Sequence, residues 1–186
     1  YDSFGNSVAS AGDVNGDGYD DIIVGAESND GGGTDAGKVY VYHGSSSGLS
    51  SGSAWSDQGE VAGDRFGWSV ASAGDVNGDG YDDIIIGASH HDVSSSKTNT
   101  GAAYVFFGKK NGYKSGFDLD DLNGSNGFQL GGVDTNDYTG WSVSTAGDID
   151  GDGFDDLLMG APAHDIDQEG NAGKSYAYYG KSSGFS

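Results

Sequence analysis

Three acidic loops in the sequence place oxygen-bearing side chains at alternate positions. The loops run from Asp13 to Asp21, from Asp75 to Asp83 and from Asp148 to Asp156. Each has Asp or Asn at loop positions 1, 3, 5 and 9, and glycine at position 6, where it permits a sharp bend. Ca²⁺ takes about 6–8 oxygen ligands at about 2.3–2.6 Å, and one tight turn with this alternation can supply four of them. The spacing therefore predicts a calcium site in each loop.

The predicted ligands are the side-chain oxygens at positions 1, 3, 5 and 9 and the backbone carbonyl at position 7. All are hard oxygen donors, which argues against zinc or copper, and Mg²⁺ fits less well because it keeps several waters. The three ligand sets are Asp13, Asn15, Asp17, Tyr19 and Asp21; Asp75, Asn77, Asp79, Tyr81 and Asp83; and Asp148, Asp150, Asp152, Phe154 and Asp156.

The alternative is that the loops are plain Asp-Gly hairpin turns. Two like charges about 4 Å apart repel by roughly 4 kcal/mol at an effective dielectric of about 20. Three carboxylates folded into one turn would leave that repulsion uncompensated. The same pattern occurs three times at equivalent positions, which favours calcium.

The EF-hand loop begins in a similar way, but it needs a bidentate Glu at position 12 and a helix on each side. Position 12 is Val24, Ile86 and Met159 here, each inside an apolar run typical of a strand. The closing carboxylate comes early, at position 9, because the chain must leave the loop directly into a strand. The EF-hand is therefore excluded.

The acidic loops belong to three copies of one longer unit. A similar stretch beginning at Gly5, Gly67 and Gly140 precedes each loop, and an apolar run ending in Gly-Ala follows it. The copies are 62 and then 73 residues apart, and the additional residues fall between the apolar runs, where repeat proteins tolerate insertions. The predicted repeats are residues 1–65, 66–138 and 139–186.

The repeats are predicted to be all-β, because their apolar runs are short, bounded by Gly and Asp, and rich in Val, Ile, Tyr and Phe. Ile84–Ile86 is a continuous apolar run, as expected of a strand buried on both faces. The first strand of each unit is built from small residues, which suits a crowded innermost strand. Third strands are expected at 39–43, 102–107 and 175–179, and fourth strands near 54–61 and 127–132.

Composition limits the function further. The 186 residues include 36 Gly, one Pro and no Cys, so disulfides and thiolate metal sites are excluded. The net charge is −21, from 29 acidic and 8 basic residues, and such a field repels nucleic acid. No run of about 18 apolar residues exists, so no membrane span is encoded.

This order of features resembles the FG-GAP repeat of integrin α-chain β-propellers and related microbial surface proteins. Phe4-Gly5 and Phe66-Gly67 correspond to the Phe-Gly element, and Gly160-Ala161-Pro162 to the Gly-Ala-Pro element. The acidic loop between them is the calcium motif of the family. The departures are Thr139 in place of Phe, Glu27 and Ser89 in place of Pro, and Asn15 and Asn77 in place of Asp.

The resemblance implies three blades of a β-propeller, with four strands per blade and a calcium loop between the first and second strands. It also implies an extracellular or cell-surface location. Closed propellers need at least about four blades, so we expect the chain to assemble with other copies of itself or with the rest of a longer chain. We expect the third blade to lack its outermost strand, because few residues follow Tyr179.

Three functions are compatible with these features. We favour a calcium-stabilised, non-catalytic module for adhesion or for binding an extracellular protein or glycan. The second is a structural subunit of a ring or fibre, assembled by blade stacking and strand donation. The third is a propeller-fold polysaccharide lyase or hydrolase, which is disfavoured because the basic residues are few and scattered and no catalytic constellation is recognisable.

Two loops contain neighbouring His and Asp residues. His90, His91 and Asp92 lie in one, and His164, Asp165 and Asp167 lie in the other. A His–Asp pair can act in catalysis or ligand binding. The first repeat has Asn29-Asp30 at the aligned place, so the Asp is kept while its neighbour varies. This pattern favours a turn-forming Asp beside a solvated His.

Overall fold

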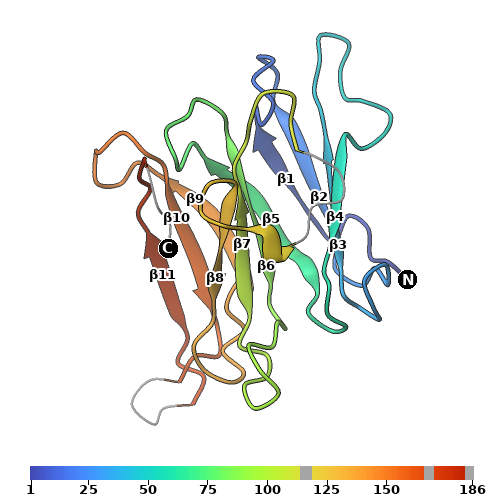
Figure 1. The fold of residues 1–186 in the computed structure, drawn as a ribbon. Helices are drawn as coiled ribbons and strands as arrows, with labels where there is room; N and C mark the ends of the chain where they lie inside the picture. Colours follow the sequence, from blue (N-terminus) through green and yellow to red (C-terminus); the bar gives the residue numbers. More distant parts are fainter. Residues whose placement is uncertain (114–118, 166–169, 183–186) are drawn as a thin grey trace.

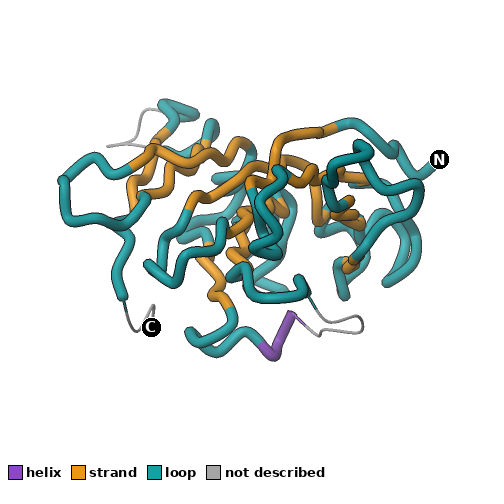
Figure 2. The backbone as a smooth tube through the Cα atoms, turned by 90° about the horizontal axis from the view of Figure 1, so that it is seen from above, coloured by secondary structure: helices purple, strands orange, loops and turns teal. Residues whose placement is uncertain are grey.

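The computed structural model describes residues 1–113, 119–165 and 170–182. Within these residues the chain forms eleven β-strands, one short 3-10 helix at Leu119–Asp121 and no α-helix. The prediction of an all-β fold with three blades is therefore confirmed. The described strands form three sheets that stand in a row and do not close on themselves (Figures 1 and 2).

Each sheet is an antiparallel meander in which strands consecutive in the chain are hydrogen-bonded neighbours. The first sheet contains β1 (Ser7–Gly12), β2 (Asp21–Ala26), β3 (Lys38–Tyr42) and β4 (Trp55–Gln58). The second contains β5 (Phe66–Gly74), β6 (Asp83–Ala88), β7 (Ala102–Phe106) and β8 (Gly127–Gly131). The third contains β9 (Ser142–Gly147), β10 (Asp156–Ala161) and β11 (Lys174–Tyr178).

The third strands begin or end one residue away from the predicted positions, and β4 is shorter than predicted. Strand ends fray, so differences of this size are ordinary. In the described part of the third sheet, no strand pairs with the outer edge of β11. Among the described residues, no helix is long and apolar enough to cross a membrane.

A register shift occurs where each first strand leads into its acidic loop. The shift places Gly12 opposite Asp21, Gly74 opposite Asp83 and Gly147 opposite Asp156. An extra residue in one strand bends that strand and increases its twist. As a result, the first strand turns directly into the loop, and the Asp at position 9 lies beside the loop entrance.

The innermost strands β1, β5 and β9 lie next to one another. The Val70 N–H in β5 donates to Ser7 Oγ in β1 over 3.0 Å. The Ser69 hydroxyl donates to the Gly140 carbonyl, just before β9, over 2.8 Å. Small side chains in these strands permit such close approach between sheets.

The hydrophobic core consists of two clusters, one on each face of the second sheet. Ile84 and Ile86 of β6 belong to the cluster shared with the first sheet. Ile85, between them, belongs to the cluster shared with the third sheet, where Leu157 and Met159 of β10 also lie. All three isoleucines are fully buried. The strand that contains them is therefore covered on both faces, and it holds the second acidic loop in place.

Candidate metal centre

The Asp at position 1 organises the turn of each acidic loop. Asp13 Oδ1 accepts hydrogen bonds from the N–H groups of Gly16 and Asp17 over 2.8 and 3.0 Å, and Oδ2 accepts one from Gly18 over 2.7 Å. Asp75 and Asp148 accept the three corresponding bonds over 2.7–3.0 Å. A short acidic side chain that bonds the following backbone is a strong local turn former, so the three loops share one conformation.

Two glycines in each loop adopt left-handed backbone conformations. In the first loop, φ is +74° at Gly16 and +88° at Gly18, a region in which a side chain causes strain. Glycine at position 6 was predicted to form the bend, but the equal requirement at position 4 was not. The recurrence of glycine at position 4 in all three loops was the available signal.

The Asp at position 9 is fully buried in each loop and connects two parts of the backbone. Its Oδ2 accepts the N–H of loop position 2 over 2.9–3.2 Å. Its Oδ1 accepts the N–H of a glycine that follows the third strand, over 2.8–2.9 Å. The three glycines were not identified from the sequence, because they lie more than twenty residues away; they are Gly44, Gly108 and Gly180.

In the third loop, three predicted ligands come together. Asp148, Asp150 and Asp156 each place a carboxylate oxygen within 4.8 Å of the others. Asp152, the fourth carboxylate, accepts the Phe154 N–H at Oδ1 over 3.0 Å. In the second loop, Asn77 stands at the position of Asp150, and its Oδ1 accepts the Asp79 N–H over 2.9 Å. The clustered carboxylates can hold a divalent cation.

The surroundings oppose ionisation of several of these carboxyl groups. Burial raises the pKa of Asp21. Burial, with the nearby carboxylates of Asp79 and Asp75, raises the pKa of Asp83 to about 8, although N–H groups of Gly108 and Val76 oppose the rise. Partial desolvation and the Asp152 carboxylate raise the pKa of Asp150. A divalent cation among such groups favours their ionised form, so the donor set fits a hard cation.

We expect the calcium-free chain to lose stability as the pH rises from about 5 to about 8.5. The folded state raises the pKa of Asp83 from 3.8 to about 8. The contribution of the Asp83 carboxyl group to the free energy of unfolding is therefore fully present at pH values below its ordinary pKa, and it is lost as the pH rises through about 8. Melting temperatures in chelator at several pH values measure this slope. In Asp83→Asn the amide stays neutral, so the slope should be shallower; an unchanged slope would exclude Asp83 as its source.

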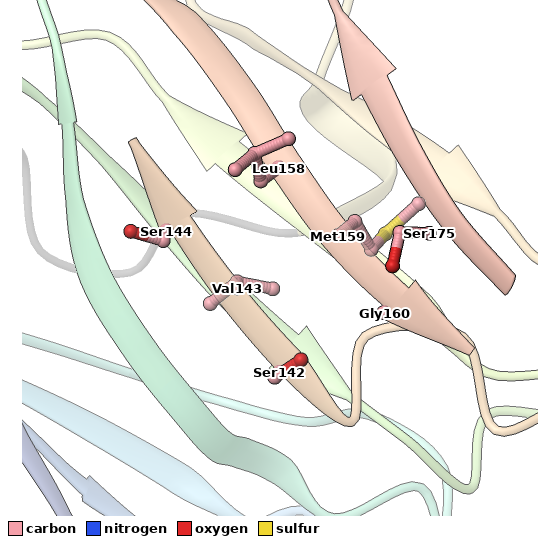
Figure 3. Close-up of a pocket in the computed structure, with 7 residues that line it drawn as sticks. All are labelled: Ser142, Val143, Ser144, Leu158, Met159, Gly160 and Ser175. Carbon is pink, nitrogen blue, oxygen red and sulfur yellow. The ribbon is translucent and has the colours of Figure 1, made fainter. Parts of the chain in front are cut away.

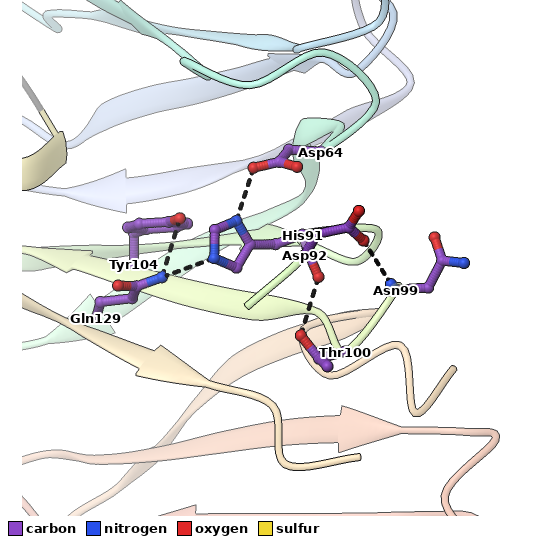
Figure 4. Close-up of polar contacts among 7 residues, drawn as sticks. All are labelled: Asp64, His91, Asp92, Asn99, Thr100, Tyr104 and Gln129. Carbon is purple, nitrogen blue, oxygen red and sulfur yellow. Dashed lines mark hydrogen bonds and ion pairs between the residues drawn. The ribbon is translucent and has the colours of Figure 1, made fainter. Parts of the chain in front are cut away.

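Two histidines pair with aspartates that were not identified from the sequence. His91 Nδ1 lies 2.7 Å from Asp64 Oδ2, and His164 Nδ1 lies 2.8 Å from Asp137 Oδ2. In each pair the Asp precedes the His by 27 residues, and that recurring separation was the available signal. Gln129 Nε2 lies 3.4 Å from His91 Nε2, and Figure 4 marks this contact with a dashed line. Both ring nitrogens of His91 thus have partners, which favours a structural role.

The neighbouring aspartates close turns instead. Asp92 Oδ1 accepts the Asn99 N–H over 2.6 Å (Figure 4), and Asp165 Oδ1 accepts the Asn171 N–H over 2.7 Å. Asp30 does the same in the first sheet, accepting the Asp35 N–H over 2.9 Å. These bonds agree with the turn-forming interpretation of the aspartates. The expectation of a solvated His is wrong, because the side chains of His91 and His164 are only 18% and 13% exposed and pair with buried aspartates. Asp167 lies outside the described residues.

A second acidic group includes a histidine. Asp134, Asp137 and His164 each place one possible ligand atom within 4.8 Å of the others. The Lys97 ammonium lies 3.9 Å from Asp134 Oδ1, so this group already has a cation beside it. Its donor set is also less suited to Ca²⁺ than the all-oxygen loops.

Comparison with known proteins gives one family and one related enzyme. The FG-GAP repeat family matches residues 4–42, 66–106 and 139–178, and each match includes an acidic loop and the first three strands of a sheet. The chain is 36% identical over 170 residues to the phosphatidylinositol-glycan-specific phospholipase D of Bos taurus. The alignment covers 87% of this chain and 19% of the bovine protein, so the chain spans about a fifth of that relative.

Proposed function

This chain belongs to the FG-GAP repeat family, and we propose that it is a calcium-stabilised β-propeller module of an extracellular or cell-surface protein. The observation that carries the proposal is the shared geometry of the three acidic loops. Each combines a position 1 Asp that accepts three N–H bonds with a fully buried Asp at position 9. Such an arrangement concentrates negative charge where a cation can neutralise it.

Calcium would be held by the oxygen donors at positions 1, 3, 5, 7 and 9 of each loop. Bound there, calcium supplies positive charge and fixes the turn between the first and second strands. The chain positions the donors, because β1, β5 and β9 end at a register shift and the second strands begin with the buried Asp. The net charge of −21 favours cation binding in general.

Terbium luminescence provides a direct test. Tb³⁺ occupies oxygen-rich calcium sites, and it emits when a nearby tyrosine absorbs light. Tyr19 and Tyr81 occupy position 7 in the first two loops, whereas Phe154 occupies it in the third. We expect emission that excess calcium displaces. The double variant Tyr19→Phe/Tyr81→Phe keeps the backbone carbonyls and should lose most of the signal; full emission from it would contradict the assignment of these loops.

The third loop is expected to bind calcium more tightly than the other two. It has four side-chain carboxylates, whereas the first two loops each have three and an Asn, and ligand charge tunes calcium affinity. Calorimetry on Asp150→Asn should show affinity lowered about tenfold at that site, which corresponds to about 1.4 kcal/mol. Asn15→Asp is the matched variant and should strengthen the first site. Unchanged affinity in both variants would contradict the charge argument.

We propose that the module binds its ligand at the end of the sheets opposite the calcium loops. Trp68 and Trp141 lie there with ring centroids 4.6 Å apart, and His90 lies 5.5 Å from Trp68. Tyr138 lies 5.1 Å from His90, and Arg65 stacks on Trp68 at 5.5 Å. Aromatic and Arg side chains are enriched in binding surfaces. This aromatic group suits an extracellular protein or a glycan.

We propose that this module is non-catalytic. The bovine relative is named for a phospholipase D activity, but the chain spans 19% of that protein, so the activity is not assigned here. The His–Asp pairs hold loops together, and each fixes one ring nitrogen of its histidine.

A further inference from the structure

The first two acidic loops are each held, at the position 1 Asp, by the acidic loop of the next sheet. The Asp13 N–H donates to Asp82 Oδ2 over 2.7 Å, and the Asp13 carbonyl accepts the Asp82 N–H over 3.3 Å. Asp155 bonds Asp75 in the same two ways, over 2.9 and 3.2 Å. Asp82 and Asp155 occupy position 8 of their own loops. The backbone of a predicted calcium ligand is therefore fixed on both sides of its Cα by a residue from the neighbouring sheet.

The residue before position 8 makes a second contact with the preceding loop. The ring of Tyr81, at position 7, lies so close to Gly16 that an added Cβ would overlap it, and the Phe154 ring lies against Gly78 in the same way. Gly16 and Gly78 have left-handed backbones and donate their N–H groups to the position 1 Asp of their loops. The next sheet therefore supports the turn of the loop as well as its first ligand.

Beyond the acidic loops, the strands of neighbouring sheets meet through small groups. Gly25 packs on the Gly67 carbonyl, and Gly87 packs on the Gly140 carbonyl. Figure 3 shows the strands of the third sheet away from its loop, where the 7 residues that line a hollow of about 260 Å³ are all serine, glycine or apolar. A cation bound in an acidic loop therefore acts on the neighbouring sheet most directly through positions 7 and 8.

Positions 7 and 8 also belong to the calcium site of their own loop. The Tyr81 carbonyl is a predicted ligand, and Asp82 lies between it and the buried ligand Asp83. A cation in the second loop would fix this segment from one side, while the first loop contacts it from the other. The same three residues thus form part of one site and the support of another.

We propose that Asp82 and Asp155 are positioning residues for the calcium site of the preceding sheet, and that they couple neighbouring sites. The inference rests on the proposed function, because it needs calcium in the loops. A cation in the second loop fixes Asp82, which holds Asp13 in place for the first cation. Coupling between binding sites is reciprocal, so each site strengthens the other by the same factor. Repulsion between two bound cations opposes the coupling, and the Asp82 carboxylate, which contacts both loops, offsets part of it.

Calcium titrations on chains with one or two intact sites measure this coupling. Asp152→Asn weakens the third site and leaves the first two. Asp79→Asn/Asp152→Asn leaves the first site alone, and Asp17→Asn/Asp152→Asn leaves the second. The coupling factor is the product of the two affinities in the two-site chain divided by the product of the two single-site affinities. We expect a factor of about ten, since coupled sites usually give about 5–150, at about 0.15 M salt, which screens distant repulsion.

Variants at position 8 assign the coupling to its residue. Asp82→Ala, made in all three backgrounds, should bring the factor close to one. Asp82→Asn keeps an oxygen that can accept the Asp13 N–H and should retain most of the coupling. Asp20→Ala is the matched control, because Asp20 occupies position 8 of the first loop and its side chain accepts no hydrogen bond from any described residue. A purely structural role for Asp82 would change the single-site and two-site affinities alike and leave the factor unchanged.

A coupling factor of one in the Asp152→Asn chain would overturn the proposal. A factor that survives Asp82→Ala, or that Asp20→Ala lowers equally, would overturn the role of Asp82. In each of these results calcium still binds, so the proposed function stands. A parent chain that binds no calcium would instead refute the proposed function itself.

Discussion

Removal of calcium is expected to lower the melting temperature of this chain by about 15–30 °C. Each site that binds only the folded state adds about 2.7 kcal/mol when free calcium is about 100 times its dissociation constant. Three sites together give about 8 kcal/mol, comparable with the whole stability of a domain, about 5–15 kcal/mol. The effect is large because the donors meet only when each loop is folded. Thermal scans in calcium and in excess chelator measure it.

Variants at loop position 5 provide the control for this experiment. Asp17, Asp79 and Asp152 each accept the N–H two residues later, and an Asn side chain can still accept that bond. Each single change to Asn should remove about a third of the rise in melting temperature that calcium causes, and it should change the melting temperature in chelator only a little. Superimposable melting curves of the parent chain in calcium and in chelator would be incompatible with calcium stabilisation.

The second large effect is expected from Gly87→Ala. Gly87 has no left-handed backbone conformation, so the cost is steric. The new Cβ would lie 2.1 Å from the Gly140 carbonyl oxygen, which belongs to the backbone of the third sheet. A backbone atom cannot move aside without separating the sheets. Overpacking of this kind costs about 3 kcal/mol or more, and denaturant unfolding would measure the loss.

Gly160→Ala is the matched control, because Gly160 is the equivalent glycine of the third sheet. Its added Cβ would approach Ser142 Oγ, the end of a side chain that can rotate away. Gly160→Ala should cost less than about 1 kcal/mol. Equal losses for the two variants would show that the junction between sheets is not the cause.

The acidic loops could be predicted because their information is local. Nine consecutive residues fix the turn, since the position 1 Asp bonds N–H groups no more than five residues away. The exclusion of the EF-hand was equally local, because Val24, Ile86 and Met159 lie inside β2, β6 and β10. The three-blade fold followed from the repetition of these local patterns, and the family match now supports it.

Contacts between distant parts of the chain could not be predicted in the same way. Asp82 was visible beside the predicted ligands, but nothing local indicates that it bonds Asp13, 69 residues earlier. The pairing of His91 with Asp64 likewise depends on how two loops meet in space. A single sequence gives turn chemistry and strand periodicity, whereas the partner of a side chain across a junction depends on the packing of the sheets.

The central claim is that each acidic loop binds one calcium ion, and equilibrium dialysis tests it most directly. The experiment counts calcium ions bound per chain for the parent and for a triple variant with Asn at Asp17, Asp79 and Asp152. Binding at all three loops predicts three ions per parent chain and a large loss of affinity in the triple variant. A parent chain that binds no calcium, or a triple variant that binds three ions as tightly as the parent, would contradict it.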